Sequence, residues 1–251
     1  MTKRYAIVRE PPSTYDGCLS DHPLKKYISI GKAKQQHKVY CQTLVDLGLE
    51  VIYLPVDDRH PDSCFVEDTA VVVGDRAFIG RFADPSRRGE EVAVQETLSS
   101  AFKIRVATEP AILEGGDVVN FGDKLLCGIT KRTNEEGARQ LREFMHIPVE
   151  TFHIPEIMHL KSYVNYLGHN TIIVSEYYAN HPYFENYRKI IVPKTETYAT
   201  NVLMVNNFLL IPHNYPKTLK LIQEAGFRGQ VIDNSEFAKC DGALTCLSII
   251  V

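Results

Sequence analysis

The sequence predicts an α/β fold in which about five similar units form one five-fold pseudosymmetric α/β propeller. Two observations lead to this prediction. A pattern of strand, turn, strand, helix and strand recurs roughly every 40–50 residues. No stretch rich in Pro, Gly or Ser divides the 251 residues, so we expect a single domain over 1–251. Short inner strands with helices outside are the arrangement that such units favour.

The first unit is predicted to be shared between the two ends of the chain. An early strand is expected at YAIVR (5–9). A helix follows over 32–47 and ends at Gly48, and a strand follows at EVIYLP (50–55). The strand that this unit lacks would be LTCLSIIV (244–251), which would close the ring.

The next two units begin with paired strands around a Gly-Asp turn. The segment 69–82, TAVVVGDRAFIGRF, is the first such pair. A helix is expected from about Ser86, and a strand at KIRVAT (103–108). The segment 117–130, DVVNFGDKLLCGIT, repeats the pattern.

The later elements follow the same rule. Thr133 and Glu136 form a T-x-x-E capping box, which predicts that the next helix starts at Thr133. A strand is expected at VETFHIP (149–155). The remaining elements are strand pairs at 162–175 and 201–212, a helix over 216–225 and a strand over 229–234.

Chemically active side chains precede the first strand of several units. They are Glu67-Asp68, Glu114-Gly-Gly-Asp117, His159, and Asp241 with Cys246. Turns often carry Asp, Glu and Gly for structural reasons, so each alone is compatible with a structural role. Their recurrence at equivalent points predicts that carboxylates, an imidazole and a thiol converge near the axis of the ring.

Two arginines lie where a second strand leads into a helix. Arg87 and Arg132 are placed unfavourably, because a cation near a helix N-terminus costs ~0.3–1 kcal/mol at exposed sites. Either they are solvated and tolerate this cost, or they form an anion site with nearby backbone N–H groups. A substrate carboxylate would suit such a site.

The composition excludes several classes of function. The chain is 44% hydrophobic and 24% charged, with a formal net charge of -3, which is typical of a globular protein without a nucleic-acid partner. No apolar run is long enough to span a membrane, and the start lacks the apolar core of a signal peptide. Six scattered cysteines without a C-x-x-C pair suggest reduced thiols in the cytoplasm. Nucleotide-binding and zinc-protease motifs are absent, so no cofactor and no metal are expected.

Six segments together resemble the dimethylarginine dimethylaminohydrolases. They are FVEDTAVVV, SRRGEE, ILEGGDVV, GITKRTNEEGAR, HLKSYVNYLGHN and DGALTC. They occur in the family's order and spacing from about residue 55 to the C-terminus. The resemblance implies the guanidino-modifying superfamily with its five-fold α/β propeller.

The resemblance also implies roles for individual residues. Cys246 would be the nucleophile, His159 the acid and base, and Glu114 the carboxylate that orients the histidine. The substrate-binding residues would be Glu67 and Asp68 at the guanidinium, Asp62 near the α-amino group, Arg87 and Arg132 at the α-carboxylate, Asp241 in the turn before the nucleophile, and Leu19 in a lid over about residues 10–30.

The implied activity is hydrolysis of Nω-methylated arginines to citrulline and methylamine or dimethylamine, through a covalent cysteine intermediate. The alternatives are a deiminase-like hydrolase of arginine or another small guanidino acid, and a non-catalytic binding module on the same fold. The last would have an incomplete Cys/His/Glu set, whereas here the set is complete. The expected partner is a small-molecule substrate, and the protein would be a monomer or a homodimer.

Overall fold

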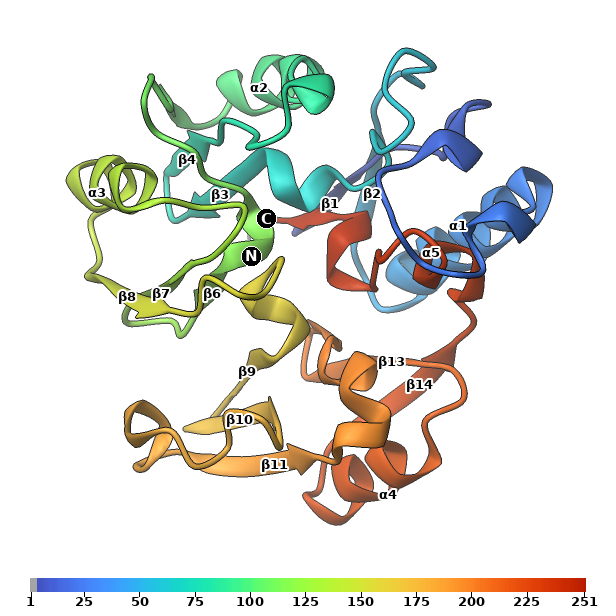
Figure 1. The fold of residues 1–251 in the computed structure, drawn as a ribbon, viewed down its shortest axis with the longest axis vertical. Coiled ribbons are helices and arrows are strands. Elements are labelled where there is room, and N and C mark those ends of the chain that lie inside the picture. Colours follow the sequence, from blue (N-terminus) through green and yellow to red (C-terminus); the bar gives the residue numbers. More distant parts are fainter. Residues whose placement is uncertain (1–3) are drawn as a thin grey trace.

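The computed structural model describes residues 4–251 and contains five three-stranded sheets arranged around a common centre (Figure 1). In every sheet the first strand runs antiparallel to the second, and the second runs parallel to the third. In chain order, the sheets consist of β3 (Ala70–Val73), β4 (Arg76–Ile79) and β5 (Lys103–Val106); β6 (Val118–Asn120), β7 (Leu125–Ile129) and β8 (Val149–His153); β9 (Val164–Gly168), β10 (Thr171–Ser175) and β11 (Arg188–Val192); β12 (Leu203–Val205), β13 (Phe208–Pro212) and β14 (Arg228–Ile232); and β15 (Ile249–Ile250), β1 (Tyr5–Val8) and β2 (Glu50–Tyr53).

The longer helices lie outside the sheets (Figure 1). The helices are α1 (Ile30–Asp46), α2 (Val92–Ser99), α3 (Glu135–Phe144), α4 (Pro216–Glu224) and the short α5 (Ser235–Ala238). None of those in the described part of the chain, residues 4–251, is long and apolar enough to cross a membrane.

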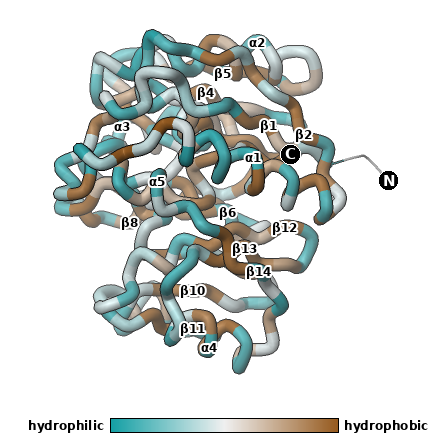
Figure 2. Tube along the Cα trace, turned by 90° about the vertical axis from the view of Figure 1, so that its right-hand side faces the viewer, coloured by the Kyte–Doolittle hydropathy of each residue, from teal (hydrophilic) through white to brown (hydrophobic). Residues whose placement is uncertain are grey.

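Five hydrophobic clusters hold the sheets together, and each cluster draws residues from two neighbouring sheets. The middle strand of each sheet contributes side chains to the clusters on both faces of that sheet, because successive side chains of a strand point to opposite faces. In β10, Ile172 and Val174 pack with the β6–β8 sheet, and Ile173 packs with the β12–β14 sheet. This double burial explains why the middle strands are rich in apolar residues, and Figure 2 shows a hydrophobic tube segment at β13.

The structure confirms the recurring unit and the pairing of the two chain ends. β15 pairs with β1 antiparallel, as the C-terminal segment was expected to do. The turn at Asn206-Asn207 has both residues at positive φ (47° and 65°), which is the geometry of a type I′ hairpin.

Some local predictions were wrong. The helix after the second unit is capped by Asn134, whose side chain accepts from the Gly137 N–H, and Thr133 instead donates to Asp117. The helix expected from Ser86 begins only at Val92, after a 3₁₀ turn over Pro85–Arg87. Strand β11 was not foreseen.

The expectation of reduced thiols is also wrong for two of the six cysteines. Cys18 and Cys240 form a disulfide across a sequence separation of 222 residues. The other four, Cys41, Cys64, Cys127 and Cys246, are free. No short spacing motif marks this pair, because only the tertiary fold brings its members together.

Candidate active site

A 3₁₀ turn precedes the first strand of each sheet. The five turns are Val66–Thr69, Gly115–Asp117, Leu160–Ser162, Lys194–Thr200 and Thr245–Leu247. Neighbouring turns contact one another, so the strand entrances do converge, as the sequence pattern predicted.

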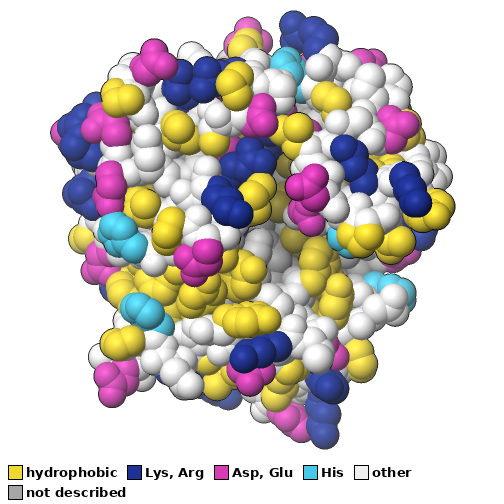
Figure 3. All heavy atoms as spheres, viewed as in Figure 1, with side chains coloured by type: hydrophobic (Ala, Val, Ile, Leu, Met, Phe, Trp, Pro, Cys, Tyr) yellow, Lys and Arg dark blue, Asp and Glu magenta, His cyan; other side chains and the backbone are white. Residues whose placement is uncertain are grey.

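A cavity of about 300 Å³ lies at this convergence. Figure 3 shows a face of the molecule that is hollowed near its middle, with Lys and Arg side chains at the rim. Eight of the ten predicted site residues line the cavity, and the exceptions are Glu67 and Glu114. The lining set includes Leu19, Asp62, Asp68, Arg87, Arg132, His159, Asp241 and Cys246.

His159 is held by carboxylates. Its Nε2 lies 2.8 Å from Glu114 Oε2 and 3.7 Å from Asp68 Oδ1. Burial alone lowers the pKa of His159, but the charge of Asp68, the hydrogen bond to Glu114 and the charge of Asp117 outweigh burial and raise the pKa to about 9. The imidazole therefore carries a proton at neutral pH and is able to donate it.

Glu114 is fully buried directly behind His159. Its Oε1 accepts a hydrogen bond from the Ala83 N–H at 3.1 Å, and the guanidinium groups of Arg87 and Arg132 each approach one of its oxygens to 3.8 Å. Two cations and an N–H thus surround the carboxylate, which keeps a buried charge tolerable.

Two glycines let the chain pass close to this pair. A Cβ on Gly116 would lie 2.8 Å from Asp68 Oδ1 and 2.9 Å from the His159 ring. A Cβ on Gly115 would lie 2.0 Å from the Glu67 carbonyl oxygen. The Glu-Gly-Gly-Asp segment is therefore required by close packing of the turns.

Cys246 is half-buried and free in the last of the five turns. Burial raises the pKa of its thiol, and the charges of Glu67 and Asp68 raise it further. The thiol is therefore protonated in this structure, and a cation placed in the cavity would lower its pKa.

The backbone beside Cys246 is fixed by a residue that lies just before β12. Asn201 Oδ1 accepts from the Thr245 N–H at 3.0 Å, and Asn201 Nδ2 donates to Thr245 Oγ1 at 3.1 Å. Tyr198 lines the cavity and donates from its hydroxyl to the Gly242 carbonyl at 2.6 Å. Neither residue was singled out from the sequence, although both lie just before β12, at the position equivalent to Glu67-Asp68 in the repeat.

The two arginines differ in their freedom to bind a ligand. Arg87 makes a bidentate pair with Glu90 (3.0 and 2.8 Å) and a 3.0 Å contact with Asp68. Among the described residues, the Arg132 guanidinium forms one ion pair, the 3.8 Å approach to Glu114, and its side chain is 14% exposed. Of the two, Arg132 has the guanidinium that is more available to a carboxylate.

Glu67 points away from the cavity that contains Cys246. Its Oε1 lies 2.6 Å from Lys161 Nζ, and its Oε2 accepts from Thr245 Oγ1 at 2.6 Å. It lines a second cavity of about 220 Å³, which is bordered by the first strands of all five sheets. This arrangement gives no support to a direct substrate contact for Glu67.

The predicted lid, residues 10–30, closes one side of the cavity. The Leu19 N–H donates to both carboxylate oxygens of Asp62 (3.0 and 3.3 Å). Ser20 Oγ donates to Asp241 Oδ2 at 2.6 Å. Burial raises the pKa of Asp62, and Asp241 is exposed with a positive φ of 56°.

One group of side chains in the described residues has ligand atoms spaced as a metal site would need. It consists of Asp68, Glu114 and His159, with ligand atoms within 4.8 Å of one another. His159 already hydrogen-bonds to Glu114 and lies 3.7 Å from Asp68, and Arg87 supplies positive charge beside both carboxylates. A cation there would have to compete with Arg87 and the His159 proton.

Three comparisons place the chain among known proteins. Residues 56–184 match the family model for arginine deiminase. The dimethylarginine dimethylaminohydrolase of Pseudomonas aeruginosa is 33% identical over 252 residues, covering 98% of each chain. A cysteine-to-serine mutant of that enzyme, solved with citrulline, superposes with a TM-score of 0.95 over 100% of both chains at 32% identity. A structure described as a dimethylarginine dimethylaminohydrolase adduct with S-methyl-L-thiocitrulline gives the same TM-score, coverage and identity.

Proposed function

Because the chain belongs to the dimethylarginine dimethylaminohydrolases, we propose that it hydrolyses the guanidino group of Nω-methylated arginines and releases citrulline with methylamine or dimethylamine. One observation carries this proposal. A protonated imidazole, His159, backed by the buried carboxylate of Glu114, faces the same cavity as a free thiol, Cys246. This is the pair that splitting a guanidinium C–N bond requires.

The cavity also has partners for both ends of the substrate. The carboxylates of Asp68 and Asp241 line it and suit a guanidinium. Arg132 suits the α-carboxylate, and Asp62 suits the α-amino group near Leu19. Glu67 supports the turn that contains Cys246, because its carboxylate accepts a hydrogen bond from the Thr245 hydroxyl.

The chemistry proceeds in two halves. The bound guanidinium lowers the pKa of Cys246, whose proton leaves to solvent because His159 already holds one. The thiolate attacks the central carbon, a C–S bond forms, and His159 donates its proton as the C–N bond to the methylated amine breaks. Neutral His159 then takes a proton from water, and the resulting hydroxide adds to the carbon. The C–S bond breaks with its electron pair on sulfur, and the hydroxyl proton of the adduct passes to that thiolate, which leaves the neutral ureido product and the thiol of Cys246.

A second candidate is the same chemistry on arginine itself, which the arginine deiminase match over residues 56–184 favours. A site for arginine needs polar partners for both terminal nitrogens, and methylation would leave one partner unpaired at ~1–3 kcal/mol. A site for methylated substrates offers apolar surface on one side, and Phe65 and Met158 supply such surface in the cavity.

A product assay separates the two candidates. Arginine, monomethylarginine and asymmetric dimethylarginine are offered in parallel to one preparation, with Cys246→Ser as the control. We expect kcat/KM for the methylated arginines to exceed that for arginine at least about ten-fold, or ~1.4 kcal/mol. Equal or faster turnover of arginine would replace the leading candidate with the deiminase. Activity of Cys246→Ser above a tenth of wild type would contradict the assignment of the nucleophile.

The closure of the five sheets into one ring is also part of the proposal. We infer that the five sheets close into one five-fold pseudosymmetric propeller domain, because five hydrophobic clusters link them in succession. A cytoplasmic location stays a prediction, and the Cys18–Cys240 bond weighs against it, since disulfides are rare in most reducing compartments. A monomer or homodimer stays a prediction as well.

A further inference from the structure

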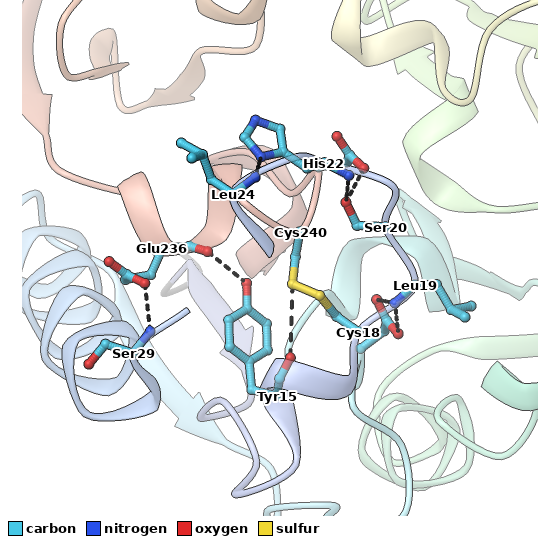
Figure 4. The surroundings of a disulfide bond; sticks show 11 residues. Tyr15, Cys18, Leu19, Ser20, His22, Leu24, Ser29, Glu236 and Cys240 are labelled. Carbon is cyan, nitrogen blue, oxygen red and sulfur yellow. Dashed lines mark hydrogen bonds between the residues drawn. A yellow bond between two sulfur atoms is a disulfide. The ribbon is translucent and has the colours of Figure 1, made fainter. Parts of the chain in front are cut away.

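We propose that the disulfide between Cys18 and Cys240 helps to position the substrate. The intact bond holds the lid over the cavity, and reduction of the bond lets the lid open. The inference rests on the proposed function. Cys18 lies in the lid, and Cys240 lies six residues before the nucleophile Cys246. The bond therefore ties the lid to the segment between α5 and the turn that contains Cys246, and Figure 4 shows the two cysteines joined.

The residues next to each cysteine form walls of the cavity. On the lid side, Leu19 lines it and donates its N–H to Asp62. On the other side, Cys240, Asp241 and Gly242 line it in succession. Two side-chain hydrogen bonds also join the lid to this wall: Ser20 Oγ donates to Asp241 Oδ2 at 2.6 Å, and Cys240 Sγ lies 3.9 Å from the Tyr15 carbonyl. The disulfide adds a covalent link between them.

The stem of the lid is held independently of the disulfide. Tyr15 is buried and packs against Phe65 and Phe237. At the other end of the lid, Lys239 Nζ donates to the Tyr27 carbonyl at 2.8 Å. Between these anchors, Cys18 is the only fully buried residue, and the rest of 16–27 is exposed or half-buried. Loss of the bond would therefore release this stretch without unfolding the domain.

The catalytic groups have supports of their own. Tyr198 holds the Gly242 carbonyl, and Asn201 holds Thr245 beside the nucleophile. The side chains of His159 and Glu114 hydrogen-bond to each other and to the Ala83 N–H, and not to Cys18 or Cys240. Breaking the disulfide should therefore weaken substrate binding and leave the chemical step nearly unchanged.

Both cysteines are buried, but each borders a hollow that a small reductant can enter. Cys240 lines the active-site cavity, and Cys18 lines a neighbouring surface hollow together with Leu19, Ser20 and Arg132. In the reduction, a small dithiol such as dithiothreitol gives two electrons and two protons. The S–S bond becomes two thiols, and the dithiol becomes its cyclic disulfide.

The first test measures the bond without any turnover. The protein, denatured under non-reducing conditions, is alkylated and weighed by mass spectrometry. We expect four labels, one for each free cysteine, and six after dithiothreitol. Hydrogen exchange across residues 16–24 should become faster on reduction. Six labels before reduction, or unchanged exchange, would overturn the proposal even if the enzyme hydrolyses methylarginines.

The second test compares kinetics in wild type and in Cys18→Ser/Cys240→Ser. Reduction of wild type should raise KM for the methylarginine about ten-fold, with kcat changed less than about two-fold. The double variant should show the high KM with or without dithiothreitol, which separates the effect from any action of the dithiol on Cys246. Cys41→Ala removes a buried free cysteine outside the cavity and should respond as wild type does. A double variant with the KM of oxidised wild type would refute the positioning role.

If arginine, monomethylarginine and asymmetric dimethylarginine are all left unchanged by the protein, the proposed function fails. The labelling and hydrogen-exchange measurements still decide whether the disulfide tethers the lid.

Discussion

Replacing Glu114 with Gln should move the alkaline limit of activity to lower pH. Glu114 Oε2 lies 2.8 Å from His159 Nε2, and the carboxylate is fully buried while the imidazole is half-buried, so the charge of Glu114 helps the imidazole to keep its proton. Asp68, at 3.7 Å, and Asp117 also raise the pKa of His159, and both remain in the variant. An opposite charge at this range shifts a pKa by ~1–3 units, so removal of one carboxylate of three should lower the pKa of His159 by ~1–2 units. That corresponds to ~1–3 kcal/mol less stabilisation of the protonated imidazole.

The sign of the effect follows from the role of His159 as the acid. Its pKa in the folded protein is raised to about 9, so the protonated form is present below that pH and is lost as pH rises through it. In wild type, kcat/KM should therefore fall above about pH 9. In Glu114→Gln the same fall should begin ~1–2 pH units lower.

Profiles of kcat/KM against pH, from about pH 6 to 10, measure the pKa that sets the alkaline limit of activity in the free enzyme. The position of the alkaline limb is the readout, because a lower plateau could also come from poorer orientation of the ring. An NMR titration of His159 in labelled protein checks the same pKa directly. Glu109→Gln, at an exposed carboxylate paired with Arg81, is the control and should keep the wild-type limb. If Glu114→Gln loses activity at the same pH as wild type, Glu114 does not hold the proton on His159.

Two further changes test other parts of the site. Arg132→Ala should raise KM about ten-fold or more, with a smaller effect on kcat, because the carboxylate it would bind is remote from the reacting carbon. A decarboxylated substrate analogue should then bind almost equally to wild type and variant, and continued discrimination would place the anchor elsewhere. Lys161→Met should lower the free energy of unfolding by about 3 kcal/mol in urea titrations, because it leaves Glu67 buried without the cation 2.6 Å away. The double change Lys161→Met/Glu67→Gln should recover part of that loss, and an unchanged unfolding midpoint in Lys161→Met would refute the reasoning.

Most of the fold could be read from local patterns. Strand pairs are encoded by apolar runs on both sides of a turn, and turns such as Asn206-Asn207 need residues that tolerate positive φ. The position of Asn134 as the cap was missed because Thr133 offered an equally good local signal. The Thr133 hydroxyl instead donates a hydrogen bond to Asp117, a residue sixteen positions earlier.

The sequence by itself determined the repeat, and with it the convergence of Asp68, Glu114, His159 and Cys246 at strand entrances. This was possible because equivalent positions of a repeated unit face the same end of a ring. Asn201 lies at the equivalent point of the unit that contains β12, but its hydrogen bonds to Thr245 became apparent only in the structure.

Only the tertiary structure decided which side chains face the cavity and which bonds join distant segments. Glu67 and Asp68 are adjacent in the chain, yet Asp68 lines the cavity of Cys246, while Glu67 turns to Lys161 and the second cavity. The Cys18–Cys240 bond spans 222 residues. Periodicity and turn chemistry report on neighbours in the chain, whereas side-chain direction and long-range pairing depend on how the sheets pack, and no short stretch of sequence encodes that packing.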